Sequence, residues 1–276
     1  MGSLSEWFEN LLFATESVVV TVIGSGGKTS LIWHLASSLR VSRQAVHEKE
    51  SSSRRKILIS PTTKMFVPPR QEKLYDRYYD EGKSPGTLNI DPAPGVTLAG
   101  RFNATSGKLE SLPLQDLERL VPSYDLVLLE GDGSGGLPLK AWKPDEPVVP
   151  SFTDLTVGVL PLWPLGKPVS EKIIHRLPLF LALTGAVPGE ILKSEHILAL
   201  ITGKARSFGP MEDGAPPLPG LFAKARGKKL LVFNQIEDDR AREQARELAG
   251  LLPSDFRAGL GAIIAGSVKD DRVTEL

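Results

Sequence analysis

The chain has 276 residues, 41% of them hydrophobic, and its 33 basic residues balance its 33 acidic residues. This length and apolar content suffice for one large α/β domain, and the balanced charge argues against a nucleic-acid-binding surface. Cysteine is absent, which excludes disulfides, thiolate metal sites and a cysteine nucleophile. No apolar run is long enough for a membrane span, and the acidic N-terminal segment predicts a short amphipathic helix rather than a signal peptide, so we expect a cytoplasmic protein without membrane contacts.

Six short runs rich in Val, Ile and Leu predict β-strands. They are apolar along their length, as strands buried on both faces of a parallel sheet are. They cover residues 18–23, 56–60, 124–129, 155–160, 229–234 and 262–266. Helical patterns lie between several of them, at residues 29–39, 114–120, 170–183, 190–201 and 238–251. The alternation predicts a single α/β domain over residues 1–276, with a three-layer α/β/α architecture like that of P-loop NTPases and a mostly parallel sheet.

Three stretches interrupt this alternation. Residues 41–55 are polar and predict a mobile loop, and residues 207–220 are dense in Pro and Gly and predict an exposed loop. Residues 87–112 contain a turn signal between two alternating runs, which predicts a β-hairpin inserted in the α/β body.

The segment after the first strand has the layout of a phosphate-binding loop. It consists of Gly24, Ser25, Gly26, Gly27, Lys28, Thr29 and Ser30, and an apolar helical pattern follows. The glycines allow backbone N–H groups to approach a phosphate, Lys28 adds a positive charge, and the Thr29 hydroxyl can bind Mg²⁺ at a helix N-terminus that favours anions. The usual pattern has a glycine where this chain has Val22, so the short loop resembles that of Mur-type ligases. We expect ATP or GTP as the ligand, with Mg²⁺.

A second signal ends the strand at residues 124–129, where Glu130 is followed by Asp132. Acids at a strand end near a phosphate loop can hold Mg²⁺ or position an attacking water. Because the two side chains project to one side of an extended chain, they can share one ion. We therefore predict Thr29, Glu130 and Asp132 as metal ligands, and Lys28, Glu130 and Asp132 as catalytic residues. The alternative is a solvated acidic turn.

Polar residues outside these motifs are candidate substrate contacts. They are Thr62, Thr63, Lys64, Lys140, His175 and Arg176. The first three follow the strand at residues 56–60 and face the same crevice, where hydroxyls can reach Mg²⁺ through water. Lys140 can reach a second anionic group, and His175 can carry a proton. The alternatives are a helix cap at residues 62–64, a solvated Lys140 and a structural histidine in a helix.

The strand at residues 229–234 ends in Asn234-Gln235-Ile236-Glu237. In guanine-specific NTPases an N-K-x-D sequence at this place reads the base. Asn234 and Glu237 are therefore candidate base contacts, although Gln replaces the lysine and Glu the aspartate. This departure leaves ATP and GTP both open, with a slight preference for GTP. The alternative is a helix N-terminus whose acids favour the dipole.

In this order the motifs resemble those of the YqeC family. They are V-I-G-S-G-G-K-T-S, S-P-T-T-K-M-F-V-P, L-L-E-G-D-G-S-G-G-L-P-L-K-A and D-E-P-V-V-P, followed by L-G-K-P, H-R and a late N-Q-x-E. The resemblance spans residues 18–267, and G-D-G-S-G-G-L-P-L-K is its most specific part. Family members are described as accessory proteins of selenium-dependent molybdenum hydroxylases. Gly131 stands where the family usually has Ala.

The resemblance implies a nucleotide-binding protein that assists the maturation of a selenium- and molybdenum-containing partner enzyme. It also implies that residues 24–29 bind phosphate and that residues 62–64, Glu130, Asp132 and Lys140 line the same site. Without cysteine, the chain cannot carry selenium on a thiol of its own, so a selenium role must involve a phosphorylated donor, a bound pterin or a partner protein.

Three functions are compatible with these motifs. The first is a Mg²⁺-dependent NTPase that assists cofactor-enzyme maturation, and nucleotide turnover without an acceptor favours it. The second is a Mur-like ATP-dependent ligase or small-molecule kinase, for which turnover requires an acceptor. The third is a non-catalytic nucleotide- or pterin-binding module, which binds without turnover.

Overall fold

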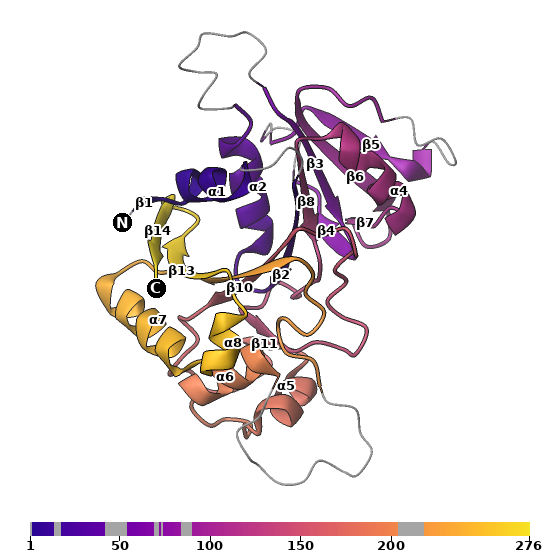
Figure 1. Ribbon diagram of the computed structural model, residues 1–276. Helices are drawn as coiled ribbons and strands as arrows, with labels where there is room; N and C mark the ends of the chain where they lie inside the picture. The colour runs from indigo at the N-terminus through magenta and orange to yellow at the C-terminus, as the bar shows by residue number, and fades with distance from the viewer. Residues whose placement is uncertain are drawn as a thin grey trace.

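The protein is a mixed α/β protein built on one large, mostly parallel sheet (Figure 1). The computed structural model describes residues 2–13, 18–41, 54–68, 72, 74–83, 90–203 and 218–276. Most of the predicted loops at residues 41–55 and 207–220 lies outside these ranges, as do residues 87–89 of the predicted hairpin.

Seven parallel strands form the centre of the sheet. In spatial order they are β13 (Ala262–Ser267), β12 (Lys228–Asn234), β10 (Leu155–Pro161), β2 (Val18–Gly24), β8 (Leu126–Glu130), β3 (Lys56–Pro61) and β6 (Gly95–Asn103). All six predicted strands are among them. Strand β2 lies in the middle and is buried along its whole length, as its apolar sequence requires. The glycine turn at its end therefore lies at the centre of the carboxyl edge of the sheet, where ligands of such sheets bind.

Shorter strands extend the sheet at both edges. On one side, β14 (Arg272–Glu275) and β1 (Gly2–Ser3) are antiparallel to their neighbours. On the other, β5 (Arg77–Asp80) pairs with β6 in parallel, and β7 (Lys108–Glu110) and β4 (Lys64–Phe66) add antiparallel pairs. Strands β9 (Leu139–Lys140) and β11 (Ile174–His175) form a separate parallel pair.

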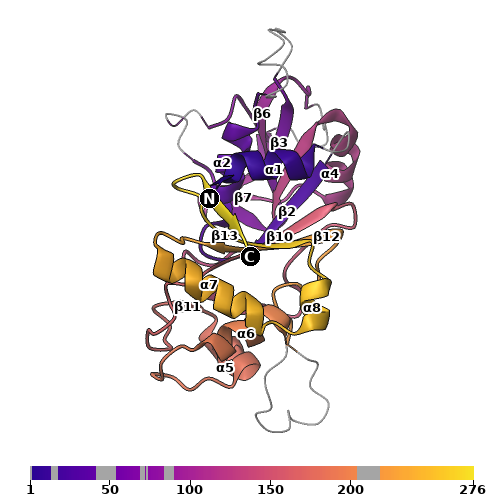
Figure 2. The ribbon, with the colours of Figure 1, turned by 60° about the vertical axis from the view of Figure 1, so that its left-hand side comes forward.

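Helices cover both faces of the sheet, which gives three layers (Figures 1 and 2). The described helices are α1 (Leu4–Leu12), α2 (Lys28–Ser38), α4 (Leu114–Leu120), α5 (Leu177–Thr184), α6 (Ser194–Thr202), α7 (Asp239–Leu251) and α8 (Ser254–Ala258), with short 3₁₀ turns η2 (Glu81–Lys83) and η3 (Val121–Ser123). Alternate residues of β2 show the division, because Val20 packs against α1 and α2 while Val19 packs with α4. None of these helices has the length and apolar character that a bilayer span requires.

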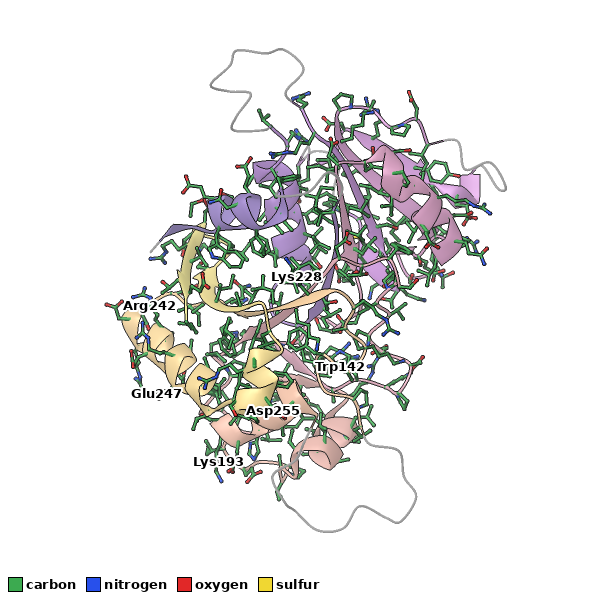
Figure 3. All side chains as sticks on the ribbon, viewed as in Figure 1. Trp142, Lys193, Lys228, Arg242, Glu247 and Asp255 are labelled. Carbon is green, nitrogen blue, oxygen red and sulfur yellow. The ribbon has the colours of Figure 1, made fainter. Side chains whose placement is uncertain are left out.

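The amphipathic helices turn their polar faces outward. In α7, Ala245 and Leu248 are buried against the sheet while Glu247 is exposed on the outer side (Figure 3). Trp142 lies inside the molecule and is the largest fully buried side chain among the described residues.

The predicted helix at residues 170–183 is wrong in its first half. Residues 170–173 form a turn, Ile174 and His175 form β11, and the helix begins only after Arg176. Arg176 has a φ of 61°, a left-handed conformation that cannot continue a right-handed helix. His175 therefore lies in β11 and Arg176 lies just before the start of α5, and neither lies on a helix.

The hairpin region is part of the main sheet. Strands β6 and β7 are antiparallel and are joined by a turn at residues 103–107, as the sequence predicts. However, the first half of β6 pairs in parallel with β3 and buries Val96 and Leu98 in the core. The hairpin is thus a continuation of β6, a strand of the main sheet. Strand β4, which follows β3, pairs with β7 and so adds a third strand to the hairpin.

Candidate functional site

The glycine turn, residues 24–27, joins the end of β2 to the start of α2 and requires glycine by its geometry. Gly24 and Gly27 have φ angles of 101° and 125°. A Cβ atom at Gly24 would lie 2.2 Å from the Val159 carbonyl oxygen, and one at Gly27 would lie 2.2 Å from Asn234 Nδ2. The turn is therefore packed tightly against β10 and β12, and no side chain can replace these glycines without displacing their neighbours.

Backbone donors remain free at this turn. The N–H of Ser25 donates to the Val159 carbonyl at 2.9 Å, but within the described part of the chain no acceptor receives the N–H groups of residues 26–30. The first turn of a helix leaves such groups without intrahelical partners, and the helix dipole adds positive potential there. Five consecutive donors at the start of α2 form a surface that favours an anion.

Lys28 lies under the turn, with only 3% of its side chain exposed. Its ammonium donates to the Gly24 carbonyl at 2.7 Å and forms an ion pair with Asp132 at 3.2 Å. The positive charge is thus held directly beneath the free N–H groups.

Asp132 is fully buried, and protein donors occupy both of its oxygens. Its carboxylate accepts the N–H of Gly24 at 3.1 Å, the indole N–H of Trp142 at 2.6 Å, and the ammonium groups of Lys28 at 3.2 Å and Lys140 at 3.1 Å. The side chain therefore anchors the glycine turn from below. Within the described part of the chain its contacts are with Lys28, Lys140, Trp142 and the turn, and it makes no contact with Thr29.

Glu130 ends β8 between Val22 of β2 and Pro61 of β3, and the residue is 5% exposed. Its Oε2 accepts the hydroxyl proton of Thr29 at 2.7 Å. Burial raises the pKa of Glu130, while the charge of Lys28 and the Thr29 hydrogen bond oppose the rise. A hydroxyl and a carboxylate thus lie together at the start of α2.

The pair fits Mg²⁺, which takes oxygen ligands and is commonly held by one or two protein groups together with water and phosphate oxygens. The described residues contain no group of three carboxylates or imidazoles that could hold a metal ion by themselves. Of the three predicted ligands, the structure brings Thr29 and Glu130 together and places Asp132 apart from them, under the turn.

Lys140 and Arg176 lie behind this site and do not line it. Lys140 is fully buried and contacts Asp132, the Gly133 carbonyl at 2.7 Å and Glu146 at 3.3 Å. Burial lowers the pKa of Lys140, and the charges of Asp132 and Glu146 oppose this shift. Arg176 binds both oxygens of Glu146, one of them at 2.7 Å. These residues form a buried charge network that holds the segment after β8 in place.

Of the other predicted substrate contacts, some are buried in the protein and one lies at the surface of the pocket. Thr62 is buried and donates to the Val148 carbonyl at 2.6 Å, while the Thr63 hydroxyl is buried without a described partner. Burial lowers the pKa of His175, as do the nearby charges of Arg176 and Lys140, which favours the neutral imidazole. Lys64 is half exposed, pairs with Glu110 at 2.8 Å and lines the pocket above Glu130.

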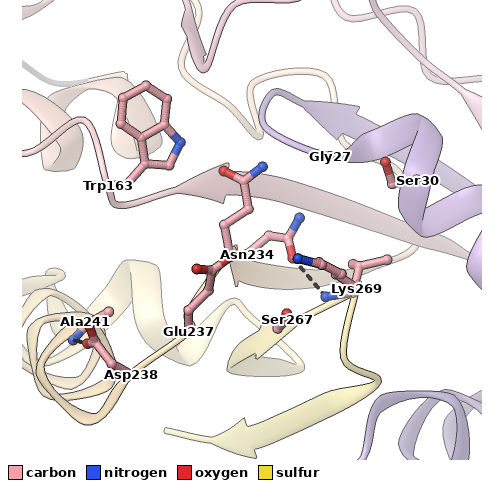
Figure 4. Close-up of a pocket in the computed structure, with 11 residues that line it drawn as sticks. Gly27, Ser30, Trp163, Asn234, Glu237, Asp238, Ala241, Ser267 and Lys269 are labelled. Carbon is pink, nitrogen blue, oxygen red and sulfur yellow. Dashed lines mark hydrogen bonds between the residues drawn. The ribbon is translucent and has the colours of Figure 1, made fainter.

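Two pockets meet over the glycine turn. One, of about 350 Å³, runs from Trp163 and Gln235 across residues 26–30 and Glu130 to β4 and β7. The other, of about 440 Å³, lies at the carboxyl ends of β12 and β13, with Trp163 on one side and Gly27 and Ser30 on another (Figure 4). Gly27, Ser30, Trp163 and Gln235 line both, so the two pockets adjoin at the glycine turn, and we refer to them together as the groove.

Asn234 ties the turn to the second pocket. Its amide donates to the Gly26 carbonyl at 2.9 Å and accepts the N–H of Val268 at 3.2 Å, so it links β2, β12 and the end of β13 (Figure 4). Glu237 is exposed and lines the pocket. Gln235 has a φ of 62°, which is rare for a residue other than glycine and often marks a functional site.

Among the residues of the groove that were not predicted, three have large side chains that can contact a ligand. Trp163 lines both pockets, and Phe66 and Lys108 line the smaller one. Trp163 follows the carboxyl end of β10, a position that could have indicated a ligand contact. Phe66 and Lys108 had no such signal, because only the folded hairpin brings β4 and β7 beside Glu130.

Two comparisons with known proteins identify the family. The sequence model described as YqeC protein matches residues 20–178, which is more than half of the chain. The chain belongs to the YqeC family. A relative from Escherichia coli (strain K12), named "Uncharacterized protein YqeC", is 30% identical over 207 residues, which cover 71% of this chain and 72% of the relative. The match to the YqeC model includes the glycine turn, Glu130, Asp132 and the β9–β11 pair, so the candidate site lies largely within the part that defines the family.

The burial of Glu130 and Asp132 predicts opposite effects on stability. The Asp132 charge is compensated by two buried lysines, so Asp132→Asn should destabilise the protein by about 3–5 kcal/mol. Glu130→Gln removes a desolvated charge and keeps an acceptor for Thr29, so it should raise the melting temperature at pH 7 by about 2–4 °C for each kcal/mol gained. Thermal unfolding of both variants checks this, with the exposed Glu247→Gln as a matched control that should leave the melting temperature unchanged.

The same carboxyl predicts a pH effect. Because the folded pKa of Glu130 lies above its ordinary value of 4.5, its contribution to stability is present below that value and is lost as the pH rises through the folded pKa. Glu130→Gln should therefore gain most over wild type at the higher pH. These roles would be contradicted if the difference in melting temperature between Glu130→Gln and wild type did not change as the pH rises. They would also be contradicted if Asp132→Asn stabilised the protein.

Proposed function

We propose that this protein binds a nucleoside triphosphate with Mg²⁺ over the glycine turn and hydrolyses or transfers its terminal phosphate. The observation that carries the proposal is the set of free N–H groups at residues 26–30, which lies between the buried Lys28 ammonium and the Thr29–Glu130 pair. A polyphosphate uses all three features at once, because backbone donors, a lysine and a metal ion together neutralise its charge.

Electrostatics support an anionic ligand. The site and the network behind it contain the cations of Lys28, Lys140 and Arg176 and the carboxylates of Asp132 and Glu146, while burial disfavours the charged form of Glu130. The free N–H groups of residues 26–30 and the dipole of α2 add positive potential that phosphate oxygens would compensate, and Mg²⁺ would favour the ionised Glu130.

In this proposal, Thr29 and Glu130 would hold Mg²⁺ together with phosphate oxygens and water. The metal would neutralise charge on the terminal phosphates and orient them. Lys28 would stabilise the same charge from beneath the turn, and Asp132 would keep Lys28 and the turn in position without binding the metal.

The nucleoside would occupy the larger pocket, which adjoins the phosphate site at Trp163 and Gln235. The carboxylate of Glu237, which lines this pocket, can accept hydrogen bonds from N1–H and the amino group of guanine. Adenine has no such pair of donors. This supports GTP slightly over ATP. Asn234 would act on the base indirectly, because its amide already binds the turn and the end of β13.

The biological role rests on the family resemblance. We propose that nucleotide turnover assists the maturation of a selenium-dependent molybdenum hydroxylase, which would be the protein partner. A ligase or kinase is the second candidate function, and one observation favours it. The smaller pocket continues beyond Glu130 to Phe66 and Lys108, which leaves room for an acceptor.

Removing the Thr29 hydroxyl tests the nucleotide proposal. Thr29→Val keeps the shape of the side chain and removes a proposed Mg²⁺ ligand, so it should reduce the effect of Mg²⁺ on triphosphate affinity by about tenfold or more. Titration calorimetry of ATP and GTP with and without Mg²⁺ measures this. Thr105→Val, at the exposed hairpin turn, is the matched control. If wild type binds neither triphosphate, or if Thr29→Val keeps the full Mg²⁺ effect, the proposal fails.

Replacing Glu237 tests the base assignment. Glu237→Gln removes the carboxylate but keeps one acceptor, so it should lower the GTP-over-ATP preference about tenfold and leave affinity for ATP unchanged. Competition binding of the two triphosphates and their diphosphates decides it. Asp239→Asn, an exposed acid at the start of α7 and two residues further along the chain, should leave the preference as it is. A variant with an unchanged base preference would place the base elsewhere.

A further inference from the structure

The far wall of the smaller pocket is made by β4 and β7. Strand β4 follows the end of β3 after two residues, and β3 is the direct neighbour of β8, so this wall lies next to Glu130. In the β4–β7 register Phe66 pairs with Lys108 and Lys64 with Glu110, while Met65 pairs with Leu109. Directly opposite residues share a face, and the two faces alternate along the strands. The side chains of Met65 and Leu109 are buried in the core, and Lys64, Phe66 and Lys108 of the other face line the pocket.

The charge on this wall is not balanced. Lys64 is neutralised by Glu110 at 2.8 Å, but Lys108 forms no ion pair within the described part of the chain. Its ammonium lies 4.5 Å from the centroid of the Phe66 ring. Lys108 and Glu130 line the same pocket. An uncompensated cation therefore faces the space beyond Glu130.

The same space is bordered by exposed aromatic rings. Phe66 is 63% exposed and Trp163 is 47% exposed. Among the large hydrophobic side chains of the described residues, only one other aromatic ring, that of Phe102, is similarly exposed. Two of these three line one pocket, on different walls. Rings left in water at a concave surface are typical of ligand sites in which the ligand covers them.

The proposed nucleotide does not use this wall. Its phosphates would lie on residues 26–30 and its nucleoside would leave through Trp163 and Gln235 into the larger pocket. Phe66 and Lys108 line the smaller pocket and not the larger one. The terminal phosphate would therefore face a cavity whose β4–β7 wall offers the Lys108 cation, the Phe66 ring and Lys64, which Glu110 neutralises.

We propose that the β4–β7 wall binds the second substrate, a small anion with a planar unsaturated ring, with its anionic group on Lys108 and its ring on Phe66. The inference rests on the proposed function, because it assigns the glycine-turn side of the pocket to the triphosphate. It favours a transfer reaction to an acceptor over simple hydrolysis. It also names Lys108 and Phe66 as substrate-binding residues.

The experiment uses the full chain saturated with Mg²⁺ and a non-hydrolysable triphosphate, so that the nucleotide pocket is blocked. Three probes are titrated by calorimetry: 2-naphthoate, its neutral counterpart 2-naphthamide, and the non-planar anion cyclohexanecarboxylate. We expect 2-naphthoate to bind at least about tenfold more tightly than either control, because only it has both the charge and the flat ring. Equal affinity for the three probes, or no binding of 2-naphthoate, would overturn the proposal.

Variants locate the site. Lys108→Met and Phe66→Leu should each weaken 2-naphthoate binding about tenfold and leave the nucleotide affinity unchanged. Phe102→Leu and Lys167→Met, which remove an exposed ring and an exposed charge outside the pocket, should change neither.

If Lys108→Met instead weakens the triphosphate but not the diphosphate and leaves 2-naphthoate unaffected, Lys108 contacts the terminal phosphate and the acceptor proposal is wrong. If wild type binds no nucleotide, the proposed function fails instead, and 2-naphthoate titration of the nucleotide-free protein tests the wall separately.

Discussion

The buried carboxylate of Asp132 is the interaction on which the rest of the site depends. It accepts the N–H of Gly24, pairs with Lys28 and Lys140, and receives the indole proton of Trp142. Through these contacts one side chain joins the turn after β2, the segment after β8 and the β9–β11 pair. A buried charge is stable only when it is paired and hydrogen-bonded, so this arrangement has few alternatives. It fixes the start of the glycine turn at Gly24, while β10 and β12 leave no room for side chains there.

Two acids separated by one residue therefore have different physical roles. Asp132 pairs with two lysines and accepts a backbone N–H, whereas Glu130 is buried with one hydroxyl partner and, among the described residues, has no cation at ion-pair distance. The first is a structural anion. The second is a carboxyl whose charged form is disfavoured until a positive ion is near, and that is a suitable property for a group that binds a metal only together with an anionic ligand.

The sequence predicted the sheet well because its strands are continuous apolar runs, and such runs have one stable place, between two layers of helices. It also predicted the glycine turn, whose residue types are dictated by backbone geometry. It predicted less about residues 170–176, because their apolar spacing fits a helix and only the left-handed Arg176 ends that pattern. Spacing alone could not separate Glu130 from Asp132, since the difference arises from Lys140 and Trp142, which reach Asp132 only in the folded chain. Phe66 and Lys108 were missed for the same reason.

A crystal structure with Mg²⁺ and a non-hydrolysable triphosphate tests the central claim most directly. The account predicts phosphate oxygens on the N–H groups of residues 26–30, Mg²⁺ on Thr29 and Glu130, and Asp132 still bound to Gly24 and Lys28 beneath the turn. A nucleotide bound elsewhere, or an Asp132 carboxylate that leaves the turn to coordinate the metal, would contradict it.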